Sequence, residues 1–135
     1  MFERWKGSNI PIIMTESIKI KQMENSRFKF RVWDNVDYMS RPFTLQDLQL
    51  KKVQFTRDCP IMQFTGLHDK NGAMIFEGDL VKFNTSIRVV EYYKHCFWFI
   101  DHKNDYKFPI NMIMDETLRG IEVVGDIHSN PELIK

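Results

Sequence analysis

The sequence predicts a mainly β protein with a minor α component, and three observations favour this fold class. Aromatic residues make up 13% of the 135 residues and include eleven Phe, which is typical of sheets whose thin core is filled by large rings. Apolar and polar side chains alternate in several short runs, the pattern of half-buried strands. Asn71-Gly72 lies between two apolar arms and is the strongest short-range signal for a β-hairpin.

Composition and length fit one small globular protein. Hydrophobic residues at 43% and charged residues at 27% are ordinary values, and 135 residues can bury a core without disulfides. The formal charge of +1 predicts no bulk attraction to nucleic acid or to a membrane. Cys59 and Cys96 do not suggest a disulfide framework, and the sequence shows neither a secretory signal nor a membrane-spanning run. We therefore expect a cytoplasmic protein with reduced thiols and no membrane partner.

The N-terminal part divides into two expected segments. Residues 1–26 show no sustained period and are expected to form an extension that acts as a flexible arm. Residues 27–60 are expected to form a β-rich subdomain, because apolar residues alternate with polar ones from residue 28 to residue 32. Thr44 and Asp47 resemble a capping box and predict a short helix near 44–50, followed by a strand near 53–55.

The C-terminal part, residues 61–135, shows mainly β signals. Asn71-Gly72 predicts a type I′ turn, in which both central residues have positive φ, and Gly78 predicts a bend between two strands. Residues 93–95 predict a second hairpin, and Asn130 followed by Pro131 predicts a terminal helical turn with Asn130 as its N-cap. Strands are expected around 61–65, 73–76, 79–84, 87–93, 95–100 and 121–127.

Three blocks of this sequence resemble the YopX family of phage and prophage proteins. They are Phe28-Lys29-Phe30-Arg31-Val32-Trp33-Asp34, the stretch from Gln63 to Phe83, and Ile121 to Ile127 with Asn130-Pro131-Glu132-Leu133 behind it. The blocks follow the family's order over most of the chain. The resemblance implies that bent antiparallel sheets in residues 61–135 close into a small, SH3-like pseudo-barrel. It also implies a phage or prophage gene and a protein of the bacterial cytoplasm, with no accepted enzymatic activity or ligand. The leader before Arg27 departs from the family pattern.

Glu77-Gly78-Asp79 is the motif that comes nearest to catalytic chemistry. Two carboxylates on either side of a glycine can act as acid and base or can bind a cation. A metal site needs more oxygen ligands than two, however, and no further ligand can be placed beside them from the sequence. We therefore interpret Gly78 as a bend and the two acids as its polar surroundings, and we keep a metal-assisted hydrolase only as a third hypothesis.

The histidines and cysteines do not predict a metal centre or a nucleophile. Paired ligands at zinc spacing, such as Cys-x-x-Cys, are absent from the sequence. Cys96 stands in an apolar strand pattern, where an inert buried thiol is the ordinary expectation. We expect no cofactor.

One candidate nucleic-acid surface is Trp33 with Lys29 and Arg31, since an aromatic ring beside cations can stack a base and bind its phosphate. Trp98 with Tyr92 and Tyr93 offers a second such surface. The alternation favours a structural interpretation of the first, with Lys29 and Arg31 outside and Trp33 closing the core.

The sequence therefore favours a non-catalytic accessory protein that binds a partner or regulates one. The alternative is a module for single-stranded nucleic acid. Self-association is a further expectation, because exposed strand edges can pair with another copy. The identity of any protein partner cannot be derived from these residues.

Overall fold

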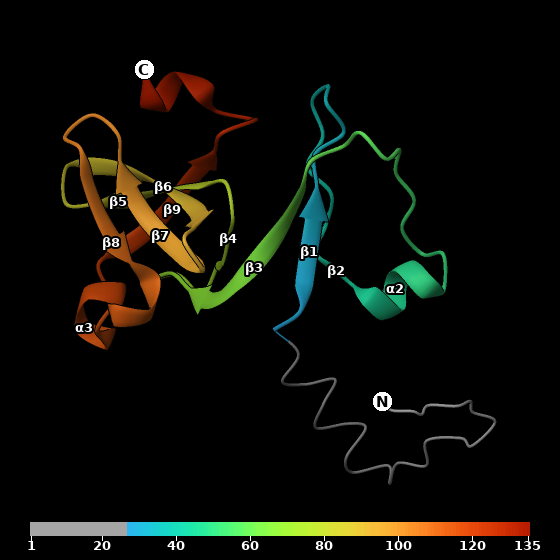
Figure 1. Ribbon diagram of the computed structural model, residues 1–135, viewed down its shortest axis with the longest axis horizontal. Coiled ribbons are helices and arrows are strands. Elements are labelled where there is room, and N and C mark those ends of the chain that lie inside the picture. Colours follow the sequence, from blue (N-terminus) through green and yellow to red (C-terminus); the bar gives the residue numbers. More distant parts are fainter. Residues whose placement is uncertain (1–26) are drawn as a thin grey trace, which may run out of the picture.

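The computed structural model describes residues 27–135, which form two antiparallel sheets and several short helices (Figure 1). The strand orders are β2-β1-β3-β4 in a four-stranded sheet and β8-β7-β6-β5-β9 in a five-stranded sheet. The expected N-terminal arm, residues 1–26, lies outside the described residues. The elements are β1 Lys29–Val32, β2 Phe43–Thr44, α2 Leu45–Gln49, β3 Ile61–His68, β4 Met74–Phe76, β5 Asp79–Phe83, β6 Ser86–Tyr93, β7 Cys96–Asp101, β8 Tyr106–Pro109, η1 Ile110–Met112, α3 Asp115–Leu118, β9 Ile121–Asp126 and η2 Pro131–Ile134.

Strand β3 connects the two halves of the molecule. Its first residues, 61–63, pair with β1, and its later residues, Phe64 and His68, pair with β4. Figure 1 shows β3 running from the β1 and α2 side toward the five-stranded sheet. The subdomain boundary predicted between residues 60 and 61 therefore coincides with the start of a strand that belongs to both halves.

Helix α2 confirms the predicted capping box. The Asp47 backbone N–H donates to Thr44 Oγ1 at 3.2 Å, and the Thr44 backbone N–H donates to Asp47 Oδ2 at 2.9 Å. The strand predicted near 53–55 is wrong, because this segment is irregular. Phe55 packs against Phe43 with 5.9 Å between ring centroids, but both edges of β1 are already paired, to β2 and to β3.

The two predicted hairpins form, but the turn of the first differs from the expected type. In the β3–β4 loop only Gly72 has positive φ, at +83°, so the type I′ assignment at Asn71-Gly72 is wrong. The Asp69 carboxylate instead accepts hydrogen bonds from the backbone N–H groups of Asn71 and Ala73. Buried Asp69, whose backbone N–H also donates to the Ala73 carbonyl, thus holds the loop of residues 69–73, in which Gly72 supplies the left-handed conformation.

The β6–β7 hairpin has the two positive φ angles that a type I′ turn requires. They belong to Lys94, at +44°, and His95, at +75°. Neither residue is Gly, and a left-handed conformation costs an ordinary residue roughly 1–2 kcal/mol. The sequence signal for this turn type is therefore absent at the place where the turn occurs.

The five-stranded sheet contains one strand that the alternation did not predict, β8. Tyr106 and Lys107 are exposed on this edge strand, so it lacks the buried row that marks a strand in a sequence. Within residues 27–135 the two edge strands, β8 and β9, do not pair with each other, and the sheet does not close into a hydrogen-bonded barrel. The mainly β fold is confirmed, whereas the closure that the resemblance implied is not found.

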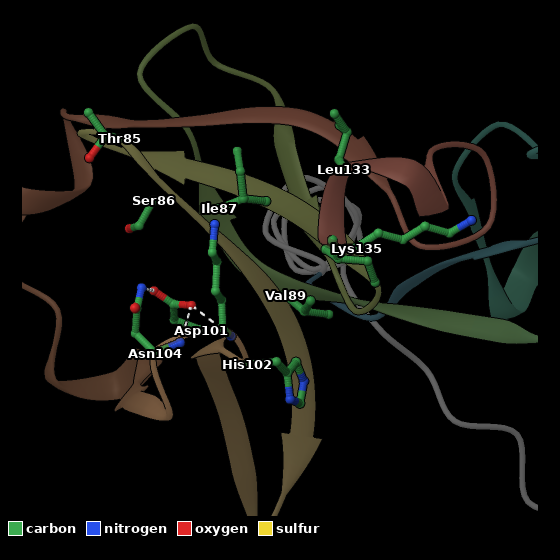
Figure 2. A pocket seen from close by; sticks show the side chains of 11 residues that line it. Thr85, Ser86, Ile87, Val89, Asp101, His102, Asn104, Leu133 and Lys135 are labelled. Atoms are coloured by element: carbon green, nitrogen blue, oxygen red, sulfur yellow. Dashed lines mark hydrogen bonds between the residues drawn. The ribbon is translucent and has the colours of Figure 1, made fainter.

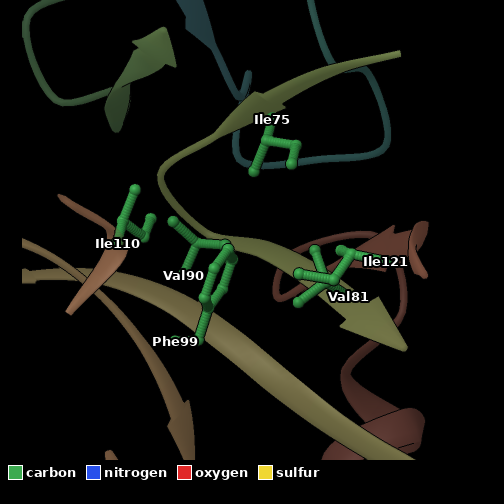
Figure 3. Close-up of a cluster of buried hydrophobic side chains, with 6 residues drawn as sticks. All are labelled: Ile75, Val81, Val90, Phe99, Ile110 and Ile121. Atoms are coloured by element: carbon green, nitrogen blue, oxygen red, sulfur yellow. The ribbon is translucent and has the colours of Figure 1, made fainter. Parts of the chain in front are cut away.

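The hydrophobic core packs both sheets together (Figure 3). Ile75 of β4 lies against Val81, Val90 and Phe99, three neighbouring side chains on one face of the five-stranded sheet. Ile110 of η1 and Ile121 of β9 complete the buried cluster. We call this face the inner face, and the opposite face, which carries Leu80, Val89 and Ile100, the outer face.

The C-terminal turn is the 3₁₀ helix η2, so the predicted helical turn forms. Asn130 occupies the N-cap position, as predicted, but its side chain makes no cap hydrogen bond to this helix. Asn130 Oδ1 instead accepts from the Asp126 backbone N–H at 3.2 Å. This contact needs Gly125, since a Cβ there would lie 2.3 Å from Asn130 Oδ1.

Within the described part of the chain, no helix combines the length and the apolar character needed to cross a membrane.

Candidate functional site

The Glu77-Gly78-Asp79 motif forms the bend between β4 and β5. Gly78 has a φ of +85°, as this bend requires, and its backbone N–H donates to the Val90 carbonyl at 2.7 Å. Asp79 is 1% exposed, and Oδ2 of its carboxylate accepts a hydrogen bond of 2.7 Å from the Phe76 backbone N–H. Glu77 is half-buried and lies near the backbone N–H of Gln63, on β3. Each of the two acids therefore has its own contacts, and the motif is not an open pair of carboxylates.

Arg31 of β1 completes the environment of Asp79. Its Nη2 donates to Asp79 Oδ1 at 2.6 Å, and its guanidinium lies 4.7 Å from the centroid of the Phe76 ring. Only 12% of the Arg31 side chain is exposed, whereas the alternation along β1 predicted that it points outward. The ion pair joins the four-stranded sheet to the five-stranded sheet across 48 positions of sequence, so no local pattern indicates it.

Burial has the largest effect on the pKa of the Asp79 carboxyl. It raises the pKa of this carboxyl to about 6, while the Arg31 guanidinium and the Phe76 N–H oppose the increase. The neighbouring Asp126 carboxylate, opposite Asp79 in the β5–β9 register, adds to the increase. Both oxygens of Asp79 are occupied by protein donors. Among residues 27–135, no group of three or more His, Cys, Asp or Glu side chains is arranged to hold a metal ion.

The structure does not bring Lys29, Arg31 and Trp33 together as one surface. Trp33 is 8% exposed and stacks on the His128 ring, with 5.6 Å between centroids and 13° between planes. Lys29 lies over the Phe64 ring at 6.0 Å, and Arg31 pairs with Asp79. A base that stacked on Trp33 would have to displace His128.

The histidines and cysteines are likewise dispersed. Cys59 and Cys96 are both free thiols, and the Cys59 sulfur lies 3.2 Å from the Thr56 hydroxyl. His102 contacts Glu91 on the outer face of the five-stranded sheet. This geometry shows no pairing of a thiol with an imidazole.

The second aromatic surface of the sequence analysis is the one that the fold assembles. Tyr93 and Trp98 lie on the outer face at the β6–β7 hairpin, where the indole Nε1 of Trp98 donates to the Tyr93 carbonyl at 2.6 Å. Tyr92 points to the other face and packs against Phe97, so it does not belong to this surface. The Nζ atoms of Lys94 and Lys107 lie 5.3 and 5.1 Å from the Tyr93 ring centroid. We call these four residues (Tyr93, Lys94, Trp98 and Lys107) the hairpin platform.

The lysines of the hairpin platform carry no individual signal in the sequence. Lys107 comes from β8, the edge strand that the alternation did not predict, and the β7–β8 pairing places it beside the Tyr93 ring. Lys94 is directed to the ring by the positive φ of the turn. Tyr93 and Trp98 were recognisable as aromatics, but their cationic neighbours depend on strand pairing.

A polar pocket lies farther along the same strands, beside η2 (Figure 2). Its cavity volume is about 310 Å³. The pocket has an apolar wall that includes Val89 and Leu133, and its rim carries Lys103, Lys135 and the imidazole of His102.

The carboxylate of this pocket, Asp101, is engaged by its own loop. It accepts hydrogen bonds from the backbone N–H groups of Lys103 and Asn104 and from the Asn104 side-chain amide, as the dashed lines of Figure 2 show. The amide of Asn104, with these N–H groups, holds the pKa of the Asp101 carboxyl below its ordinary value. Among the side chains that line the pocket, the two lysines, Lys103 and Lys135, thus face one carboxylate.

Two solved structures resemble this fold. The crystal structure of protein EF1440 from Enterococcus faecalis matches with a TM-score of 0.55 and 23% sequence identity, over 79% of this chain and 97% of that chain. The X-ray crystal structure of protein yopX from Bacillus subtilis matches with a TM-score of 0.48 and 17% identity, over 82% of this chain and 100% of that chain. At 23% identity, the similarity to EF1440 concerns the fold alone. None of the curated proteins matches this chain.

The family model described as "YopX protein" matches residues 16–135. The matched region begins before Arg27, so part of the leader that the sequence analysis set apart from the family lies within it. Because this region covers most of the 135 residues and includes all three blocks of the resemblance, the chain belongs to the YopX family.

Proposed function

We propose that this YopX-family protein is a non-catalytic binding module, and that single-stranded nucleic acid is the partner that its outer face suits best. The observation that carries the proposal is the hairpin platform, in which two lysine ammonium groups lie over an exposed tyrosine ring beside Trp98. Aromatic rings that stack bases, with cations that bind phosphates, are the usual means of holding a single strand. The role of an accessory or regulatory protein of a phage or prophage, in the bacterial cytoplasm, is part of the same proposal.

The geometry of Asp79 does not favour a catalytic role for the acid pair. A general acid or base must reach a substrate proton, but Asp79 is buried and both of its oxygens accept hydrogen bonds from the protein. The elevated pKa of Asp79 follows from burial in a junction between sheets. It therefore does not require a catalytic explanation.

Charge is favourable on the outer face. Lys94 and Lys107 at the hairpin platform and Lys103 and Lys135 at the pocket rim are exposed, while Glu91 of the same face contacts His102. The formal charge of the whole chain is only +1, so affinity would depend on this local arrangement.

The strained hairpin turn agrees with a role for its residues. Lys94 and His95 both adopt a left-handed conformation that Asn and Gly would adopt at lower cost. Strain that persists in a structure points to a function for the strained residues. Here the turn presents the Lys94 ammonium to the Tyr93 ring.

The test is fluorescence anisotropy with a labelled single-stranded oligothymidylate of about 16 nucleotides, titrated at several salt concentrations. We expect salt-dependent binding that the double variant Lys94→Glu/Lys107→Glu weakens by about tenfold or more, with a shallower salt dependence. Tyr93→Ala should weaken binding by a similar factor, because stacking of one base contributes about 1–3 kcal/mol.

Two control variants locate the effect. Lys51→Glu/Lys52→Glu makes the same charge change at exposed positions after α2 and should leave the affinity nearly unchanged. Lys29→Glu tests the first candidate surface and should also have little effect. If the protein does not bind at low salt, or if both double variants lose affinity equally, the nucleic-acid proposal is wrong. Self-association through the edge strands β8 and β9 stays a prediction.

A further inference from the structure

Arg88 of β6 lies on the inner face of the five-stranded sheet, opposite Val81 in the β5–β6 register. Its guanidinium carbon is 5.1 Å from the Phe83 ring centroid and 4.8 Å from the Tyr106 ring centroid. The planar cation is thus held by two aromatic rings, one from β5 and one from the edge strand β8. Such contacts orient a guanidinium but do not satisfy its N–H groups.

The charge of Arg88 has no carboxylate partner within residues 27–135. Its Nε is buried and has no hydrogen-bond partner there, and the guanidinium forms no ion pair with any acid of this part of the chain. The positive charge of Arg88 contributes to the lowered pKa of the Asp101 carboxyl, but the oxygens of Asp101 accept their hydrogen bonds from Lys103 and Asn104. A buried N–H group without a partner is costly, so an external acceptor would be favourable here.

A small cavity lies next to this guanidinium, with a volume of about 140 Å³. Its lining contains one charged residue, Arg88, and one residue with an aliphatic hydroxyl, Thr117 of α3. The other lining side chains are aromatic or branched aliphatic and come from β5, β7, β8, β9 and the η1–α3 connection: Val81, Phe83, Phe99, Tyr106, Phe108, Ile113 and Ile121. An apolar cavity of roughly 150 Å³ accommodates a benzene ring.

We propose that this cavity binds a small monocarboxylate that carries one aromatic ring or a short branched aliphatic group. The apolar group fills the cavity between the inner face and α3. The carboxylate pairs with the guanidinium of Arg88, which is suited to bidentate recognition of carboxylates. The site is on the opposite side of the sheet from the hairpin platform and does not depend on nucleic-acid binding.

The probe for this site is benzoate, titrated into the full-length protein and followed by amide chemical shifts in ¹⁵N-resolved NMR spectra. We expect saturable shifts in β6, β8 and α3, with a dissociation constant at least tenfold lower than for benzyl alcohol, which has the ring without the charge. Acetate, which has the charge without the ring, should bind at least tenfold more weakly than benzoate.

Three variants test the residues. Arg88→Met keeps an unbranched apolar stem and should weaken benzoate binding at least tenfold, whereas Arg57→Met, at an exposed loop position, should leave it unchanged. Thr117→Met fills the cavity from α3 without touching the charge, and it should also abolish binding. This third variant decides the question if Arg88→Met does not fold.

Several outcomes would overturn the proposal. They are absence of saturable benzoate shifts, equal affinity for benzoate and benzyl alcohol, shifts confined to the outer face, and benzoate binding that survives either cavity variant. Loss of oligothymidylate binding in the hairpin-platform variants would leave this result unaffected, because those residues do not line the cavity.

Discussion

Arg31 and Arg88 have similar surroundings in two regions of this protein, but only Arg31 forms an ion pair with a carboxylate of the described residues. Each guanidinium lies within about 5 Å of an aromatic ring centroid, and each has a buried Nε without a hydrogen-bond partner among the described residues. Arg31 pairs with the buried carboxylate of Asp79, across the junction of the two sheets. Arg88 has only rings and a small cavity beside it.

The difference shows how a half-buried guanidinium can be structural in one place and available to a ligand in another. At the junction, the bend at Gly78 presents Asp79 to Arg31 and to the Phe76 N–H, so the chain itself supplies the anion. At the cavity, the carboxylate of Asp101 interacts electrostatically with Arg88 but accepts its hydrogen bonds from its own loop. The charge of Arg88 is left for solvent or for a ligand.

The largest expected effect comes from removing the ion pair between Arg31 and Asp79, which joins the two sheets. Asp79→Ala leaves Arg31 buried without its partner and should lower the free energy of unfolding by about 3–5 kcal/mol. Urea denaturation at neutral pH measures the loss, and Asp37→Ala, at an exposed position, is the control with the same chemical change. The double variant Arg31→Met/Asp79→Leu should recover much of the stability. A loss below about 1 kcal/mol in Asp79→Ala would show that the ion pair does not hold the sheets together.

A second prediction concerns the pH dependence of the same junction. Burial raises the pKa of Asp79 from 3.8 to about 6, so the folded state holds this proton more tightly than the unfolded state. The resulting stabilisation is fully present below about pH 4 and is lost as the pH rises through 6. Over the complete titration, from below pH 4 to above pH 6, the free energy of unfolding should fall by up to about 3 kcal/mol more than in Asp79→Asn, since one pKa unit corresponds to about 1.4 kcal/mol.

Urea denaturation of both proteins at pH 4, 5, 6 and 7 measures this difference. Arg31, the Phe76 N–H and Asp126 are the groups that act on Asp79, and none of them is altered by the Asn substitution. Identical pH profiles for the two proteins would mean that folding does not change the pKa of Asp79, and a rise in relative stability with pH would mean that folding lowers this pKa.

The smallest expected effect concerns the second arginine. Arg88→Met breaks no ion pair of the described residues and loses only ring contacts, so it should change the free energy of unfolding by about 1 kcal/mol or less. Arg31→Met, measured under the same conditions, should cost several times more because it leaves Asp79 unpaired. Equal losses in the two variants would remove the distinction between the two regions.

Local patterns predicted much of the fold. Thr44 and Asp47 predicted the capped helix, Asn71-Gly72 the position of the β3–β4 hairpin, and most strands were found within a few residues of their expected bounds. These features depend on side chains close in sequence. The β8 strand was missed because its edge position leaves it without a buried row.

The candidate site was less predictable than the fold. Trp98 and Tyr93 were noticed as aromatics, but only strand pairing brings Lys107 to the same ring. The first candidate surface contained Arg31 and Trp33, whose side chains are occupied by Asp79 and His128. Alternation along one strand cannot show whether its polar row faces solvent or another sheet.

By itself, the sequence determined the fold class, the hairpin positions, the helix cap and the family, because each of these depends on residue types at short or fixed spacing. Only the tertiary structure decided which charged side chains form ion pairs within the protein and which remain available to a ligand. Arg31 and Asp79 are 48 positions apart, and Arg88 meets its two rings through strand pairing and the packing of side chains on one face. An ion pair depends on the distance between two side chains in space. For residues far apart in the sequence, this distance is set only when the sheets pack together.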